Sequence, residues 1–171
     1  MSKAAPTERE QAIAAPDIRV LKSETCPSLS GKSTLTYHVG VSPESVISIR
    51  VFANSGGGFF NRDWIEFKTL QKVLGTRTGA NPVTSSAFGE LFPGKSVNTT
   101  GFLLAVLKHI ELVKPLQDKP RCYEFVDPSK WLAEIEALMT SSAVEPQDTA
   151  TPSKPVAPVR KGGPKVKATY A

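Results

Sequence analysis

Residues 35–53 read LTYHVGVSPESVISIRVFA, and this stretch decides the fold of the chain. Apolar residues occupy every second position over 35–41 and again over 47–53. A period of two predicts two β-strands, each with one buried face. The intervening residues, 42–45, form a turn sequence in which proline presets φ. The stretch therefore predicts an antiparallel β-hairpin.

Weaker signals precede the hairpin. Residues 1–16 mix alanine and charged residues with two prolines, so we expect a flexible leader there. Residues 17–21 predict a short edge strand. Residues 22–32 are polar and rich in turn formers, which predicts a loop.

The first helix signal follows a glycine-rich loop. Asp63 as N-cap, with Glu66 three residues later, resembles a capping box and predicts a helix over 64–74. The apolar face of this predicted helix carries Trp64, Phe67, Leu70, Gln71 and Leu74.

Four further elements are expected downstream. A short helix is predicted over 85–92, and Asn98 is expected to cap a third helix over 99–111. Two apolar segments around a polar loop predict a second hairpin over 112–126. An Asp-Pro pair then predicts the start of a last helix over 128–140.

These elements predict an α+β fold in one domain, residues 17–143. Its β-rich part is expected over 17–62 and its helical part over 63–143. Residues 144–171 contain five prolines and few apolar side chains, so we expect a disordered basic tail there.

Much of the positive charge lies in that tail. The chain has a net charge of +5. Residues 144–171 hold five Lys or Arg against two acids, and residues 1–16 are neutral, which leaves +2 for the predicted domain. A basic chain favours polyanionic partners, but here less than half of the excess belongs to the predicted fold.

Composition also argues against several classes of protein. Cys26 and Cys122 stand far apart, and with His38 and His109 they do not form a zinc-site spacing, so we expect no metal and no cofactor. Neither histidine has a Ser, Asp or Cys partner at a catalytic spacing, so we expect no enzyme.

Localisation follows from the apolar segments. The longest one, 102–113, is interrupted by charged residues and is too short for a membrane span. The N-terminus has no secretory apolar region. These features predict a cytoplasmic protein without a membrane partner.

The order of helices and hairpin over about 64–140 resembles the winged helix-turn-helix superfamily. The resemblance rests on element order and length. It implies that the third helix enters the DNA major groove and that the hairpin, as the wing, contacts the backbone. It implies a DNA-binding protein with a role in transcription regulation.

By position, this resemblance yields a set of nucleic-acid contacts from the third helix and the wing. Residues 95–121 carry a net charge of +3, from five Lys or Arg against two acids, which favours phosphate binding. The predicted contact residues are Lys95, Asn98, Thr99, Thr100, Lys108, Lys114, Lys119 and Arg121. Duplex DNA is the expected partner, and the residues suited to base readout are few.

Two alternatives stay open at this stage. The non-core face of the first hairpin carries Thr34, Thr36, His38, Ser48, Arg50, Phe52 and Asn54. Such a basic and aromatic face can stack single-stranded bases, or these side chains can pack under another element. The chain can also be a non-enzymatic protein-interaction or assembly module. The sequence leaves its oligomeric state open.

Overall fold

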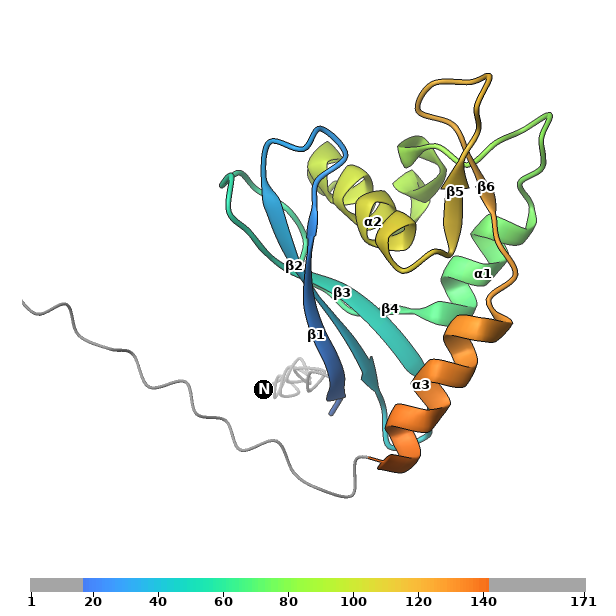
Figure 1. Ribbon diagram of the computed structural model, residues 1–171. Coiled ribbons are helices and arrows are strands. Elements are labelled where there is room, and N and C mark those ends of the chain that lie inside the picture. The colour runs from blue at the N-terminus through green and yellow to red at the C-terminus, as the bar shows by residue number, and fades with distance from the viewer. Residues whose placement is uncertain (1–16, 142–171) are drawn as a thin grey trace, which may run out of the picture.

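The predicted hairpin is the centre of an antiparallel sheet. The computed structural model describes residues 17–141, so the predicted leader and tail lie outside the described residues. The sheet runs in the order β1-β2-β3-β4, and β5 and β6 form a separate two-stranded sheet (Figure 1). The elements are β1 Arg19–Pro27, β2 Thr34–Val41, β3 Ile47–Asn54, β4 Ile65–Glu66, α1 Phe67–Gly75, the 3₁₀ helix η1 Ser85–Leu91, α2 Val97–His109, β5 Val113–Pro115, β6 Tyr123–Phe125 and α3 Ser129–Ser141.

The turn between β2 and β3 follows from its side chains. The Ser42 hydroxyl accepts hydrogen bonds from the backbone N–H groups of Glu44 and Val46, at 3.2 and 3.3 Å. Serine closes such turns with its own side chain. The hairpin prediction is therefore confirmed, with β2 and β3 paired from Val41–Ile47 to Leu35–Asn54.

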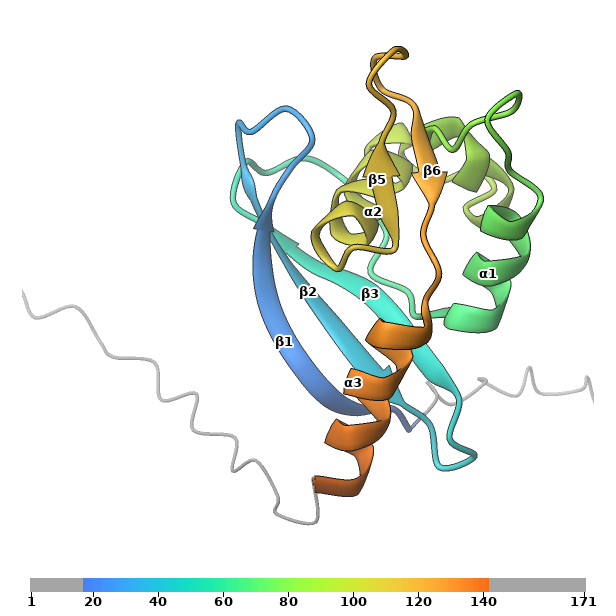
Figure 2. The ribbon, with the colours of Figure 1, turned by 45° about the vertical axis from the view of Figure 1, so that its right-hand side comes forward.

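Helix α2 packs across one face of this sheet, which we call the inner face. Figure 1 and Figure 2 place α1, α2 and α3 on this same side of β1–β3. Alternate residues of β2 and β3 supply the sheet's share of the core, and residues 103–107 of α2 supply five consecutive buried residues. The buried inner-face residues of the two strands are Leu35, Tyr37, Val39, Val41, Ile49 and Val51.

Helix α3 closes the far end of the core. Its Trp131 packs on Phe67 of α1, with ring centroids 4.8 Å apart. Its start is set by Asp127, whose carboxylate accepts the Ser129 N–H at 2.8 Å, so the predicted capping role of this residue is confirmed. Near its other end, Met139 and Asp17 line one surface depression beside the β2–β3 turn.

Strand β1 is longer than the sequence predicts. We expected a strand over 17–21 and a loop after it, whereas β1 continues to Pro27. A register shift between Val20 and Lys22 turns Lys22 and Glu24 toward the inner face. There Lys22 bonds Glu134 of α3 at 2.7 Å, so these polar residues belong to a strand despite their sequence pattern.

The start of α1 is a second correction. Helix α1 begins at Phe67, and Ile65–Glu66 instead pairs with β3 as β4. The Asp63 carboxylate accepts from the Asn61 side chain at 2.7 Å and does not cap the helix. Trp64 is therefore not part of the helical apolar face, and its ring lies over β2 on the other side of the sheet.

The winged-helix arrangement is not confirmed, although its elements occur in the expected order. Segment 85–92 is a 3₁₀ helix, the second hairpin is present as β5–β6, and α2 is capped by Ser96 and not by Asn98. A recognition helix needs an exposed face along its length. The middle of α2 is buried instead, because the four-stranded sheet and η1 both pack against it.

Gly40 fixes how Trp64 and the start of β1 meet the sheet. A methyl group at Gly40 would lie 2.5 Å from Ile18 Cγ2 and 2.9 Å from Trp64 Cη2. Real Cβ atoms essentially never approach so closely, so the backbone or the ring would have to shift. Glycine thus permits both side chains to close over β2.

We predict that Gly40→Ala lowers the free energy of unfolding by about 1–3 kcal/mol, because it overpacks this contact. Urea denaturation followed by circular dichroism would measure the change. Gly101→Ala in α2 is the matched control, since its Cβ would meet nothing within 4 Å. That control should raise stability by about 0.5–1 kcal/mol. An unchanged midpoint for Gly40→Ala would contradict the prediction.

Candidate nucleic-acid interface

The structure contradicts one of the predicted contact residues on α2. Thr99 is 2% exposed, and its hydroxyl accepts the Asn61 N–H at 2.9 Å. It secures the loop before β4 to the helix, so its predicted contact with nucleic acid is wrong. Thr100 is half-buried and donates to the Val97 carbonyl at 3.0 Å. Lys95 and Asn98 are exposed before and within the first turn.

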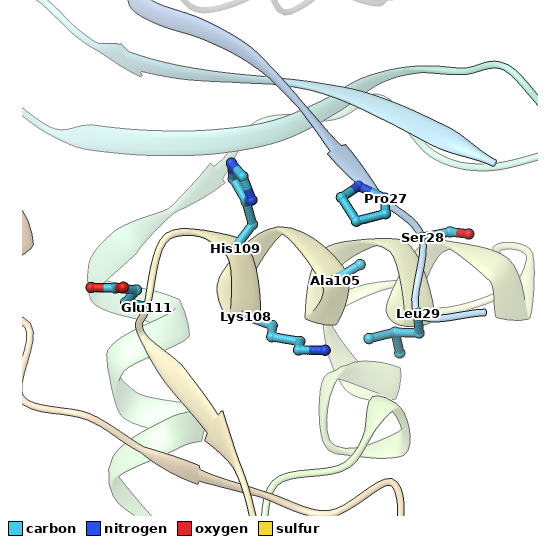
Figure 3. A pocket seen from close by; sticks show the side chains of 7 residues that line it. All are labelled: Pro27, Ser28, Leu29, Ala105, Lys108, His109 and Glu111. Atoms are coloured by element: carbon cyan, nitrogen blue, oxygen red, sulfur yellow. The ribbon is translucent and has the colours of Figure 1, made fainter. Parts of the chain in front are cut away.

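Lys108 is exposed near the other end of α2, ten residues from Asn98, or about 15 Å along the axis. It lines a groove of about 290 Å³ between α2 and the loop after β1. In Figure 3 its side chain runs along α2 toward Leu29, and His109 points toward the sheet. The His109 ring meets Tyr37 edge-on, with centroids 5.8 Å apart, so this imidazole has a packing role.

The predicted wing contacts have mixed surroundings. Lys114 forms an ion pair with Glu124 at 2.7 Å, which offsets its charge. Lys119 donates to the Gly79 carbonyl at 3.1 Å and ties the hairpin to the loop before η1. Arg121 is exposed and has a positive φ of 61°. The eight predicted residues thus lie on α2, on the segment just before it and on the β5–β6 hairpin, and among residues 17–141 no side-chain hydrogen bond joins two of them.

The other face of the sheet carries a different group of side chains. We call it the outer face, and among residues 17–141 no helix lies on it (Figure 1 and Figure 2). We define the arginine–aromatic cluster as His38, Arg50, Phe52 and Trp64. His38 and Arg50 face each other directly across β2 and β3. Phe52 follows two residues along β3, and Trp64 arrives from the segment before β4.

The four side chains of the cluster stack on one another. The His38 and Phe52 rings are nearly parallel, with an interplanar angle of 21° and centroids 4.4 Å apart. The Arg50 guanidinium carbon lies 4.3 Å from the Trp64 centroid and 5.2 Å from the Phe52 centroid. Both distances fall within the range of cation–π attraction. Arg50 thus sits between two aromatic rings.

Hydrogen bonding sets the state of His38. The Arg50 Nε–H donates to His38 Nδ1 at 3.2 Å, and Arg50 Nη2 lies 3.1 Å from the same atom. A ring nitrogen that accepts from a cation carries no proton. Burial lowers the pKa of His38, and the positive charge of Arg50 lowers it further. The imidazole is therefore neutral and holds the guanidinium in place.

Arg50 has no carboxylate partner among residues 17–141. Burial lowers its pKa from the ordinary arginine value, but arginine stays protonated in proteins. The ion pairs of the described residues join lysines to glutamates, and none of them involves Arg50. A half-buried cation without a carboxylate partner is costly, and the cation–π contacts and the hydrogen bonds to His38 offset part of that cost.

The sequence pattern predicts His38, Arg50 and Phe52 on this face but not Trp64. A helical period groups Trp64 with Phe67 and Leu70, whereas the helix begins only at Phe67. A second cation–π pair, Arg62 over Phe60 at 5.4 Å, lies in the same loop. The dense arginine and aromatic content of residues 50–64 is the signal that would have indicated the cluster.

Two apolar side chains are strongly exposed beside this loop. Phe59 is 91% exposed and Val97 is 85% exposed. Their segments are adjacent, since the Asn61 N–H bonds Thr99 of α2. A large apolar residue in water is a common mark of an interaction surface when it has apolar neighbours.

Comparison with known proteins yields no relationship: no family model, no curated protein and no solved structure matches the chain. Within residues 17–141, no cluster of three or more His, Cys, Asp or Glu side chains could hold a metal ion. No helix of that same region is long and apolar enough to cross a membrane.

The depressed pKa of His38 predicts a pH dependence of stability. The unfolded imidazole protonates near pH 6.5, whereas the folded one resists protonation. As pH falls through about 6.5, the unfolded state gains the proton first, so the free energy of unfolding should decrease and then level off below the folded pKa.

In His38→Gln the decrease in the free energy of unfolding that His38 causes should disappear. The glutamine amide oxygen can still accept a hydrogen bond from Arg50. Urea denaturation of both proteins from about pH 8 to about pH 5 measures the difference. Parallel curves over the whole range would show that His38 is not perturbed by its surroundings.

Proposed function

We propose that this protein binds nucleic acid and that its outer face makes the main contacts, with Arg50 as the central phosphate ligand. The observation that carries the proposal is the guanidinium of Arg50, held between Trp64 and Phe52 without a carboxylate partner among residues 17–141. Phosphate oxygens are the partners that planar guanidinium groups bind best.

The Arg50 guanidinium has N–H groups that are not used within the cluster and that can donate to a phosphate. A guanidinium carries five N–H groups. Those directed at His38 belong to Nε and Nη2. Among residues 17–141 the two N–H groups of Nη1 have no hydrogen-bond partner, so they can donate to an anion. The stack also fixes the plane of the guanidinium, which reduces the conformational entropy that binding would cost.

The contacts predicted from sequence become secondary in this proposal. Lys95, Asn98, Thr100, Lys108, Lys119 and Arg121 can add sequence-independent attraction, and Lys114 contributes less because of Glu124. Thr99 is excluded by its burial. A duplex held by α2 and the β5–β6 hairpin, in a regulatory DNA-binding protein, stays a prediction from the resemblance alone.

Removal of Arg50 should weaken binding more than removal of another cation. We predict that Arg50→Met reduces affinity for a 12-nucleotide oligodeoxynucleotide about tenfold or more at low salt, the scale of one charge-assisted hydrogen bond. It should also reduce the slope of log affinity against log salt by about one. Fluorescence anisotropy of a labelled oligonucleotide measures both values.

Lys119→Met makes the same change in charge on the β5–β6 hairpin and serves as control. Its effect should stay within about twofold, because one exposed cation contributes little. Arg50→Lys keeps the charge but loses the planar stack, and its affinity should fall between those of the wild type and Arg50→Met. Equal losses in Arg50→Met and Lys119→Met, or no binding at low salt, would refute the outer face as the contact surface.

A second candidate function is protein interaction, and the exposure of Phe59 and Val97 favours it. If these side chains form a partner surface, the wild type should show a concentration-dependent complex with itself. The double variant Phe59→Ser/Val97→Ser should remove that complex. Sedimentation velocity without nucleic acid tests this, and a monomer at all concentrations would leave self-assembly without support.

A further inference from the structure

We infer that the nucleic acid bound at the outer face is single-stranded and that an unpaired base stacks on the free side of the Phe52 ring. The inference rests on the proposed function and names the class of its ligand. The Phe52 ring and its stacking partners on the sheet carry it.

Phe52 has one covered side and one open side. His38 lies against the ring at 4.4 Å, nearly parallel to it, so that side is occupied. Even so, Phe52 is 41% exposed on a sheet face that no described helix covers. Among residues 17–141 the ring contacts of Phe52 are with His38 and Arg50, so we assign the exposed area to the side of the ring that points away from His38.

The column of stacked groups ends at this open side. Trp64, Arg50 with its bonded His38, and Phe52 follow one another across the outer face, within the distances given above. His38 and Arg50 both contact the Phe52 ring and restrict its rotation. Little side-chain entropy would therefore be lost when a base binds. Aromatic rings of this kind stack bases of any sequence.

The positive charge of Arg50 favours a nucleotide, which carries a phosphate, over an uncharged aromatic ligand. Arg50 is within 5.2 Å of the same ring, and among residues 17–141 the two N–H groups of its Nη1 have no hydrogen-bond partner. A nucleotide can thus place its base on Phe52 and a phosphate at Arg50. Single-strand sites combine these two features, a stacking platform and a cation along the backbone.

The paired bases inside a duplex cannot stack on the Phe52 ring. Inside a duplex each base is covered on both sides by its neighbours, so away from the duplex ends a ring can stack only on an unpaired or flipped base, and unpairing costs a few kcal/mol. A duplex could still bind Arg50 through its phosphates. The difference between duplex and single strand therefore reports stacking, whereas binding to either one reports the proposed function.

The test uses the full-length chain and three labelled probes: oligothymidylate of 12 nucleotides, the same backbone without bases, and a 12-base-pair duplex closed by a hairpin loop of abasic nucleotides at each end. Phe52→Leu removes the ring but keeps an apolar side chain, and Phe52→Tyr restores a ring. Leu29→Ala is the matched control, because Leu29 has nearly the same exposure, 42%, and lies beside α2. Circular dichroism confirms that each variant is folded.

Phe52→Leu should weaken oligothymidylate binding about 5- to 150-fold, the range of one base stacked on an aromatic side chain. It should leave the affinities for the abasic strand and the duplex unchanged. Phe52→Tyr and Leu29→Ala should bind oligothymidylate like the wild type. In a Trp131→Phe background, which leaves Trp64 as the one tryptophan of the chain, the fluorescence should change on binding of oligothymidylate more than on binding of the abasic strand.

Equal wild-type affinities for oligothymidylate and the abasic strand would overturn the inference, and so would Phe52→Leu losses that are the same for all three probes. In both cases a continued loss in Arg50→Met would leave the proposed function standing. Absence of binding to every probe at low salt would overturn both.

Discussion

The packing of α2 against one face of the β1–β3 sheet is the contact on which the rest of the structure depends. A sheet of three long strands has two faces, and alternate residues point to each. The helices α1, α2 and α3 meet the inner face, where the strands place their alternating apolar residues. Because the core is built on that side alone, the remaining side chains of β2 and β3 are left to form a surface, and the arginine–aromatic cluster lies on it.

Period-two and capping signals predicted the parts of the fold that local chemistry decides. The first hairpin, the second hairpin and the start of α3 at Asp127 are each set by residues within a short segment. The extent of β1 could not be predicted, because Lys22 and Glu24 occupy inner-face positions only through partners far along the chain, Glu134 and Tyr37. The role of Trp64 depends on Gly40 in the same way.

The candidate site shows a similar division. Sequence charge indicated residues 95–121, yet charge counts say nothing about partners: Lys114 has Glu124, whereas Arg50 has none among the described ion pairs. Burial of Thr99 could not be read from helical periodicity, because α2 is covered on more than one side. His38, Arg50 and Phe52 were recognised as one face of a hairpin, and only the tertiary structure shows that no described helix covers them.

The depression shared by Asp17, the β2–β3 turn and Met139 places the two ends of the described chain at one end of the sheet. The first residues of the described chain and the last turns of α3 therefore meet beside the β2–β3 turn, so the chain between them closes on itself at one end of the sheet.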